Sequence, residues 1–149
     1  MEKFEKNLEV RWSDLDPNFH MLHSKYYDIG AYSRMAFLVE HGLTPGVMFK
    51  YHIGPILFRE ECIFKREIKF GDKISVNFKL DKVSSDFGRW TMVHEIYKNG
   101  DTLSALITAE GAWMDTMARK LALPPQEVIA LFEKAPKTDT FSVFERSNT

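Results

Sequence analysis

The stretch RWSDLDPNFHMLHSKYYDIGAYSR, residues 11–34, determines how the whole 149-residue chain is arranged. Leading into it, Leu8, Val10 and Trp12 alternate with polar side chains, a pattern typical of a strand with one buried face. A polar loop follows at residues 13–23, and then residues 26–39 are apolar almost all round. We therefore expect a strand, a loop and a buried helix, in that order.

The long apolar run has the end signals of a helix. Ser24 is a good N-cap residue, and Gly42 followed by Pro45 ends the helix. Gly30 in mid-helix costs about 1 kcal/mol relative to Ala, so it predicts close approach of another backbone. Few polar side chains remain, so the helix should be enclosed on all sides. The clearly polar positions within residues 26–39 are Asp28, Ser33 and Arg34.

The residues from 53 to 115 have the pattern of strands. Asn99-Gly100, which lies between two strand-like segments, is the strongest short hairpin signal in the chain. One buried helix after a first strand, followed by four more antiparallel strands, is an α+β layout. In this layout the sheet wraps round the helix.

The C-terminal part predicts a short helix and a tail. Pro124-Pro125 opens the helix, because proline suits the first helical turn. Beyond residue 134 the chain is polar, so the tail is either partly flexible or docked through apolar side chains such as Phe141. The length fits one domain, residues 1–149.

Composition excludes several classes of protein. A net charge of −1 gives no electrostatic reason to expect nucleic acid or an anionic membrane as a partner. The N-terminus lacks the apolar core of a secretion signal, and no segment has the roughly 18 apolar residues of a membrane span. The single Cys62 cannot form an internal disulfide. We expect a soluble protein of the cytoplasm.

The loop before the helix carries the residues best suited to chemistry. Asp16 precedes a helix N-terminus, whose first amides are unpaired donors with partial positive charge. A carboxylate there can activate water or attack a carbonyl, and the amides can stabilise an oxyanion. Alternatively, Asp14 or Asp16 only caps a turn, since Asp-Pro is common in turns. His20 and His23 lie close by, but their spacing matches no zinc signature, so no metal is expected.

The same loop resembles that of a known family. Four of its residues match hotdog-fold acyl-CoA thioesterases of the 4-hydroxybenzoyl-CoA thioesterase type: Asp16, His20, Tyr26 and Arg34. Two later segments are similar to the link into the family's third strand and to the end of its last strand. They comprise Phe64-Lys65-Arg66 with Phe70-Gly71-Asp72, and Met114-Asp115, Arg119-Lys120 and Leu123-Pro124. The resemblance implies a hotdog fold, with a five-stranded antiparallel sheet around a long central helix and a short C-terminal helix.

The resemblance also implies an activity, hydrolysis of an acyl-CoA thioester without a cofactor. In the family, the residue matching Asp16 acts as nucleophile or general base. The amide that polarises the carbonyl maps to the backbone N–H of His23, and the histidine matching His20 shapes the site. Hotdog active sites lie between protomers, so a homodimer or homotetramer is expected.

Six further residues are candidates for substrate binding. Glu60 lies among apolar strand residues, where it either faces Asp16 of a partner chain or is turned to solvent by a β-bulge. Cations near strand ends are suited to the phosphates of coenzyme A. The six candidates are Ser24, Tyr26, Tyr27, Glu60, Arg66 and Arg89.

Three departures from the family pattern keep other functions open. Phe19 stands in place of Gly, Leu22-His23 in place of Asn-Asn, and Ala31 in place of a common helical Glu. These changes allow a non-catalytic protein that binds acyl-CoA or a lipid ligand. Enoyl-CoA hydration is a further alternative, although the loop lacks one residue before His20 that the hydratase motif has.

Overall fold

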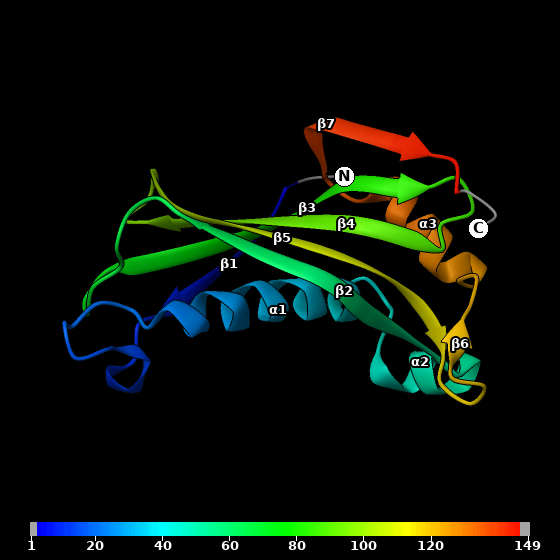
Figure 1. Ribbon diagram of the computed structural model, residues 1–149, viewed down its shortest axis with the longest axis horizontal. Coiled ribbons are helices and arrows are strands. Elements are labelled where there is room, and N and C mark those ends of the chain that lie inside the picture. The colour runs from blue at the N-terminus through cyan, green and yellow to red at the C-terminus, as the bar shows by residue number, and fades with distance from the viewer. Residues whose placement is uncertain (1–2, 147–149) are drawn as a thin grey trace.

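The computed structural model describes residues 3–146 and shows the hotdog fold that the family resemblance implies (Figure 1). An antiparallel sheet in the order β1-β3-β4-β5-β2 curls round the long helix α1. The strands are β1 (Phe4–Glu9), β2 (Ile53–Phe64), β3 (Lys73–Ser84), β4 (Arg89–Lys98), β5 (Thr102–Asp115), β6 (Lys120–Leu121) and β7 (Lys137–Phe144). The helices are α1 (His23–Glu40), α2 (Pro45–Tyr51) and α3 (Gln126–Lys134), with a 3₁₀ turn at Trp12–Asp14.

Helix α1 differs from the prediction at its start and on one face. Its N-cap residue is Leu22, so the prediction of Ser24 as the cap is wrong by two positions. Its end is as predicted, because Gly42 follows with a φ of +101°, a conformation that favours glycine. The helix is not enclosed on all sides, since Tyr32, Met35 and Val39 are exposed. These side chains leave an apolar strip of α1 uncovered in the single chain.

Two glycines, one on α1 and one on β5, allow close packing. A Cβ on Gly30 would lie 3.0 Å from Cγ2 of Ile107, so the close neighbour of this helix position is a side chain rather than a backbone. A Cβ on Gly111 would overlap the carbonyl oxygen of Ile56 and would lie 2.5 Å from the Trp90 ring. No side chain fits at residue 111 without displacing β2 or Trp90.

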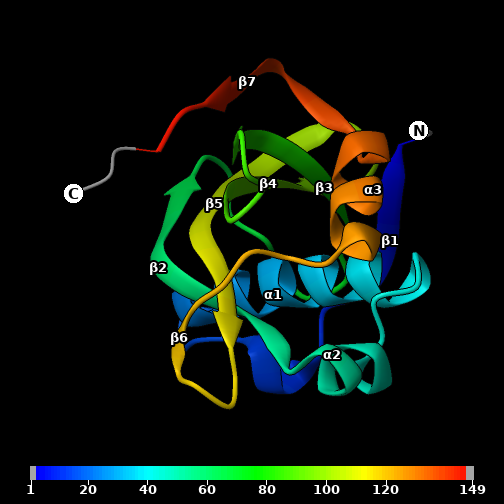
Figure 2. The ribbon, with the colours of Figure 1, turned by 90° about the vertical axis from the view of Figure 1, so that its right-hand side faces the viewer.

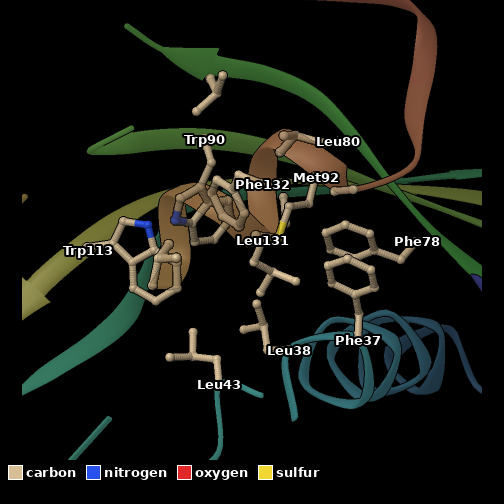
Figure 3. Close-up of a cluster of buried hydrophobic side chains, with 14 of the residues drawn as sticks. Phe37, Leu38, Leu43, Phe78, Leu80, Trp90, Met92, Trp113, Leu131 and Phe132 are labelled. Atoms are coloured by element: carbon tan, nitrogen blue, oxygen red, sulfur yellow. The ribbon is translucent and has the colours of Figure 1, made fainter. Parts of the chain in front are cut away.

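The core fills the space between the sheet, α1 and α3. Phe37 of α1 stacks on Phe78 of β3 with 4.0 Å between ring centroids, and both are fully buried (Figure 3). Phe132 of α3 packs against Trp113 of β5, with centroids 5.9 Å apart. Helix α3 therefore closes one end of the curled sheet (Figure 2).

The predicted hairpin is confirmed, whereas helix α2 and strands β6 and β7 were not predicted. Asn99 and Gly100 connect β4 to β5 with φ values of 53° and 98°, as the turn requires. The N-cap residue of helix α2 is Thr44, whose hydroxyl accepts a hydrogen bond from the Val47 amide at 3.2 Å. Strand β7, in the tail, pairs in parallel with β3 at residues 80–84.

Candidate functional site

The loop between β1 and α1 holds Asp16 in a fixed position. One carboxylate oxygen, Oδ1, accepts hydrogen bonds from the backbone amides of Asn18 at 2.8 Å and His20 at 3.2 Å. The Asp16 amide donates to the His20 carbonyl at 2.8 Å. Asp16 thus caps this turn, and within residues 3–146 its other oxygen, Oδ2, accepts no hydrogen bond.

The neighbouring carboxylate, that of Asp14, stabilises the loop. It is buried and accepts hydrogen bonds from the Arg11 amide at 2.9 Å and from Arg11 Nη2 at 3.1 Å. Burial alone would raise the pKa of Asp14, but the hydrogen bonds from Arg11 outweigh it and hold this pKa below its usual value. The Leu22 amide also donates to the Asp14 carbonyl, which connects the loop to the N-cap residue of α1.

The loop leads directly into the N-terminus of α1. Leu22, the N-cap residue, has no side-chain acceptor for the first helical amides. The amides of His23 and Ser24 therefore add their partial positive charge to the surface beside the loop. Such a group of donors can stabilise a developing oxyanion.

The two histidines take different positions. His20 Nε2 lies 3.0 Å from Glu67 Oε2, and the His20 backbone bridges to Lys69, so its ring is engaged with the loop before β3. The hydrogen bonds between His20 and Asp16 use only the backbone of His20, so the His20 ring does not contact the Asp16 carboxylate through them. The His23 side chain is exposed at the first residue of α1.

The helix candidates divide between surface and core. Tyr26 is buried and packs edge-on against Phe64, with centroids 5.0 Å apart, and burial raises its pKa. Ser24 is exposed and Tyr27 is half-buried, so both lie on the surface near the start of α1. Position alone leaves Ser24 and Tyr27 accessible to a ligand.

Glu60 faces the helix. The expected bulge in β2 is present between Leu57 and Arg59, but it does not turn Glu60 to bulk solvent. Glu60 Oε2 lies 3.3 Å from Arg34 Nη2, and its side chain is 24% exposed. In the single chain the partner of Glu60 is therefore Arg34 rather than Asp16.

The two candidate phosphate-binding arginines lie apart. Arg66 is exposed and lines a 420 Å³ cavity with Lys65. Arg89 lies over the Phe58 ring, 5.5 Å from its centroid, and lines a separate 360 Å³ cavity with Lys82. The structure does not bring Arg66 and Arg89 together within one chain.

An aromatic cluster on the loop was missed by sequence reasoning. Trp12 lies 6.2 Å from Phe19 and 5.4 Å from Phe70, measured between ring centroids. The three residues are 57–67% exposed. Phe19 has a φ of +64°, which is unfavourable for a residue with a Cβ. One signal in the sequence could have indicated this conformation: Phe19 stands where the family has glycine, and glycine adopts a positive φ freely.

The Phe19 conformation predicts an unusual order of variant stabilities. We expect Phe19→Gly to have a free energy of unfolding about 1 kcal/mol higher than Phe19→Ala, because both lose the ring but only Gly relieves the positive φ. Urea denaturation measures the difference. Phe70, which has no positive φ, is the control, and there Ala should be at least as stable as Gly. An Ala variant more stable than Gly at residue 19 would contradict the prediction.

A curled antiparallel sheet around one long helix, with a carboxylate loop at the helix start, defines a hotdog-fold protein. The model of the thioesterase-like superfamily matches residues 10–132. The chain therefore belongs to the thioesterase-like superfamily. Among curated proteins, none matches this sequence.

Solved structures support the same fold at low sequence identity. A Staphylococcus aureus protein in complex with CoA has a TM-score of 0.83 at 20% identity, covering 95% of this chain and 90% of that one. A 1,4-dihydroxy-2-naphthoyl-CoA thioesterase from Synechocystis has a TM-score of 0.78 at 17% identity, covering 89% and 97%. A DHNA-CoA thioesterase from Staphylococcus aureus has a TM-score of 0.80 at 18% identity, covering 90% and 91%.

Residues 3–146 lack two further features. There, no cluster of three or more His, Cys, Asp or Glu side chains is placed to hold a metal ion. The same residues also contain no helix that is long and apolar enough to span a membrane.

Proposed function

We propose that this protein is an acyl-CoA thioesterase in which Asp16 carries the reaction. The observation that supports it most directly is the state of the Asp16 carboxylate. One oxygen is held by two loop amides, and the other accepts no hydrogen bond within the described chain. The same loop ends at the uncapped N-terminus of α1, so a carboxylate and amide donors belong to one short segment.

The chemistry follows from these two groups. As a general base, Asp16 takes a proton from water, and the resulting hydroxide forms a bond to the thioester carbonyl carbon. The His23 amide stabilises the oxyanion. The C–S bond then breaks, and the proton held by Asp16 passes to the departing thiolate. As a nucleophile, Asp16 would instead attack the carbonyl carbon and displace the CoA thiolate as the C–S bond breaks. The resulting mixed anhydride is cleaved by water in a second step, which releases the free acid and restores the Asp16 carboxylate.

The chemical test is thiol release from a panel of acyl-CoAs. We expect free CoA thiol, detected with a thiol-reactive dye, from at least one short, long or aromatic acyl group. The purified protein is assayed beside the Asp16→Asn variant to exclude a contaminating hydrolase. Absence of thiol release across the whole panel would overturn the proposal.

A non-catalytic acyl-CoA binder is the second candidate. It is favoured by the turn-capping role of the Asp16 carboxylate and by the engagement of His20 with Glu67. Tight binding of acyl-CoA without turnover, unchanged in Asp16→Asn, would support this alternative. We place either activity in the cytoplasm, with no nucleic-acid or membrane partner.

We further propose that two copies associate through β2 and α1. Strand β2 is an outer strand of the sheet, and such strands present unpaired backbone groups to other chains. Leu57 and Phe58 on β2 are exposed, as is the apolar strip of α1 formed by Tyr32, Met35 and Val39. A partner copy would cover both, and it would place the Asp16 loop beside a second chain, as hotdog sites require.

The association predicts an effect of charge on β2. Leu57→Lys should weaken self-association at least a hundredfold, because each copy would bury a lysine in place of an apolar side chain. Sedimentation velocity measures the change. Val143→Lys on β7 is the matched control, since Val143 is also an exposed apolar strand residue. A dimer that persists unchanged in Leu57→Lys would contradict this arrangement.

A further inference from the structure

A small cavity opens between α1 and the strand β2. Its volume is about 180 Å³. Met92 and Trp90 of β4 form part of its wall, opposite Ala31 and Arg34 of α1. The remaining lining residues are all apolar: Met35, Leu38, Pro55, Ile56 and Leu57. The lining side chains are therefore apolar except for Arg34 and for the one N–H carried by the Trp90 indole ring.

Both of these polar groups lack a hydrogen-bond partner at one atom. Within residues 3–146, Arg34 Nη1 and Trp90 Nε1 are buried and unpaired. Arg34 as a whole is only 8% exposed. Buried unpaired donors are rare in native proteins, and each such group needs a specific explanation. A ligand atom that accepts hydrogen bonds in this cavity would supply the missing partner.

The charge around the cavity selects the kind of acceptor. Arg34 is already neutralised by Glu60, 3.3 Å away. His94, on the same face of β4, is fully buried, and its Nδ1 lies 3.0 Å from the Asn77 carbonyl. Burial, and next the charge of Arg34, lower the pKa of His94 to about 3, so it adds no positive charge. A ligand carboxylate would leave one negative charge unbalanced, whereas a neutral oxygen would not.

One face of α1 connects the cavity with the Asp16 loop. Ser24, Tyr27, Ala31 and Leu38 lie on this face because they are spaced three, four or seven residues apart. The distance along the helix axis from His23 to Ala31 is about 12 Å. An acyl chain whose thioester lies at the start of α1 can therefore extend along this face towards the cavity.

We propose that the cavity receives the far end of the acyl group, and that Arg34 and Trp90 select an acyl group with a neutral oxygen there. A terminal hydroxyl or oxo group has this chemistry. The inference rests on the proposed function in taking an acyl-CoA as the ligand. It adds a specificity that no comparison with known proteins assigns.

Binding is measured by calorimetry on the Asp16→Asn variant, so that turnover does not interfere. Hexanoyl-, octanoyl- and decanoyl-CoA are each compared with the ω-hydroxy and ω-carboxy forms. For at least one length we expect the hydroxy form to bind at least fivefold tighter than the unsubstituted form, and the carboxy form to bind no tighter. Equal affinities for all three forms at every length would overturn the proposal.

Two indole variants locate the effect. Trp90→Phe, which removes the N–H but keeps an aromatic ring, should reduce the hydroxy preference to less than twofold. Trp113→Phe is the matched control, because Trp113 Nε1 is also buried and unpaired but Trp113 does not line the cavity. It should keep the full preference. A full preference that survives in Trp90→Phe, or one that disappears in Trp113→Phe, would refute the assignment.

A paired variant tests Arg34 without leaving Glu60 unpaired. Arg34→Met combined with Glu60→Gln should also abolish the preference, and it decides the case if Trp90→Phe does not fold. Thiol release by the wild type is recorded separately. A hydroxy preference without hydrolysis would overturn the proposed activity and leave this inference standing. Hydrolysis without any preference would do the reverse.

Discussion

Asp16→Asn is expected to lower kcat for thioester hydrolysis by about a hundredfold to ten-thousandfold, the usual contribution of a positioned general acid or base. The fold should be retained, because the Asn side-chain oxygen can still accept hydrogen bonds from the Asn18 and His20 amides. Thiol release measures the activity, and circular dichroism during heating measures the stability.

Asp14→Asn is the matched control, two residues away in the same loop. Asp14 is buried and paired with Arg11, so this variant should lose stability. Its folded fraction should keep kcat within a few-fold of the wild type. Wild-type turnover in Asp16→Asn, or an equal loss of kcat in both variants, would show that Asp16 has no special part in the reaction.

Arg34→Met is expected to lower the free energy of unfolding by about 3 kcal/mol, the lower end of the range for breaking a buried ion pair. The reason is that the Glu60 carboxylate would lose its ion-pair partner in a site that is only 24% exposed. Adding Glu60→Gln should recover part of the loss. Urea denaturation of the two single variants and the double variant gives the coupling energy.

Arg59→Met provides the comparison, because it removes an exposed ion pair instead of a buried one. Arg59 also pairs with a glutamate, Glu61, at 2.9 Å, but both side chains are well exposed. Exposed pairs contribute little, so this variant should change the free energy of unfolding by less than about 1 kcal/mol. Equal losses in Arg34→Met and Arg59→Met would mean that burial of Arg34 contributes nothing.

The fold could be predicted where local pattern determines structure. The end of α1 at Gly42 and the hairpin at Asn99-Gly100 depend on backbone conformations that few other residues adopt. The start of α1 could not be placed, because Leu22 acts as N-cap through tertiary contacts of the loop and not through its side chain. The β7 strand pairs with β3 across more than fifty residues, and no local pattern specifies that partner.

The candidate site shows the same division. The position of Asp16 in a turn follows from its own neighbours, since all its hydrogen bonds lie within four residues. The partner of Glu60 does not follow from sequence, because Arg34 is 26 residues away on another element. The same is true of His20, whose contact with Glu67 depends on how the β2–β3 connection folds back over the loop.

The edge of the sheet opposite β2 limits how far copies of this chain can polymerise through their strands. Strand β3 is covered there by β1 along one half and by β7 along the other, and these two short strands run in opposite directions. Residues 5–7 and 9 of β1 are all charged or polar. A third chain would find no long, uniform strand to extend, so growth into a fibril is disfavoured once two β2 strands have met.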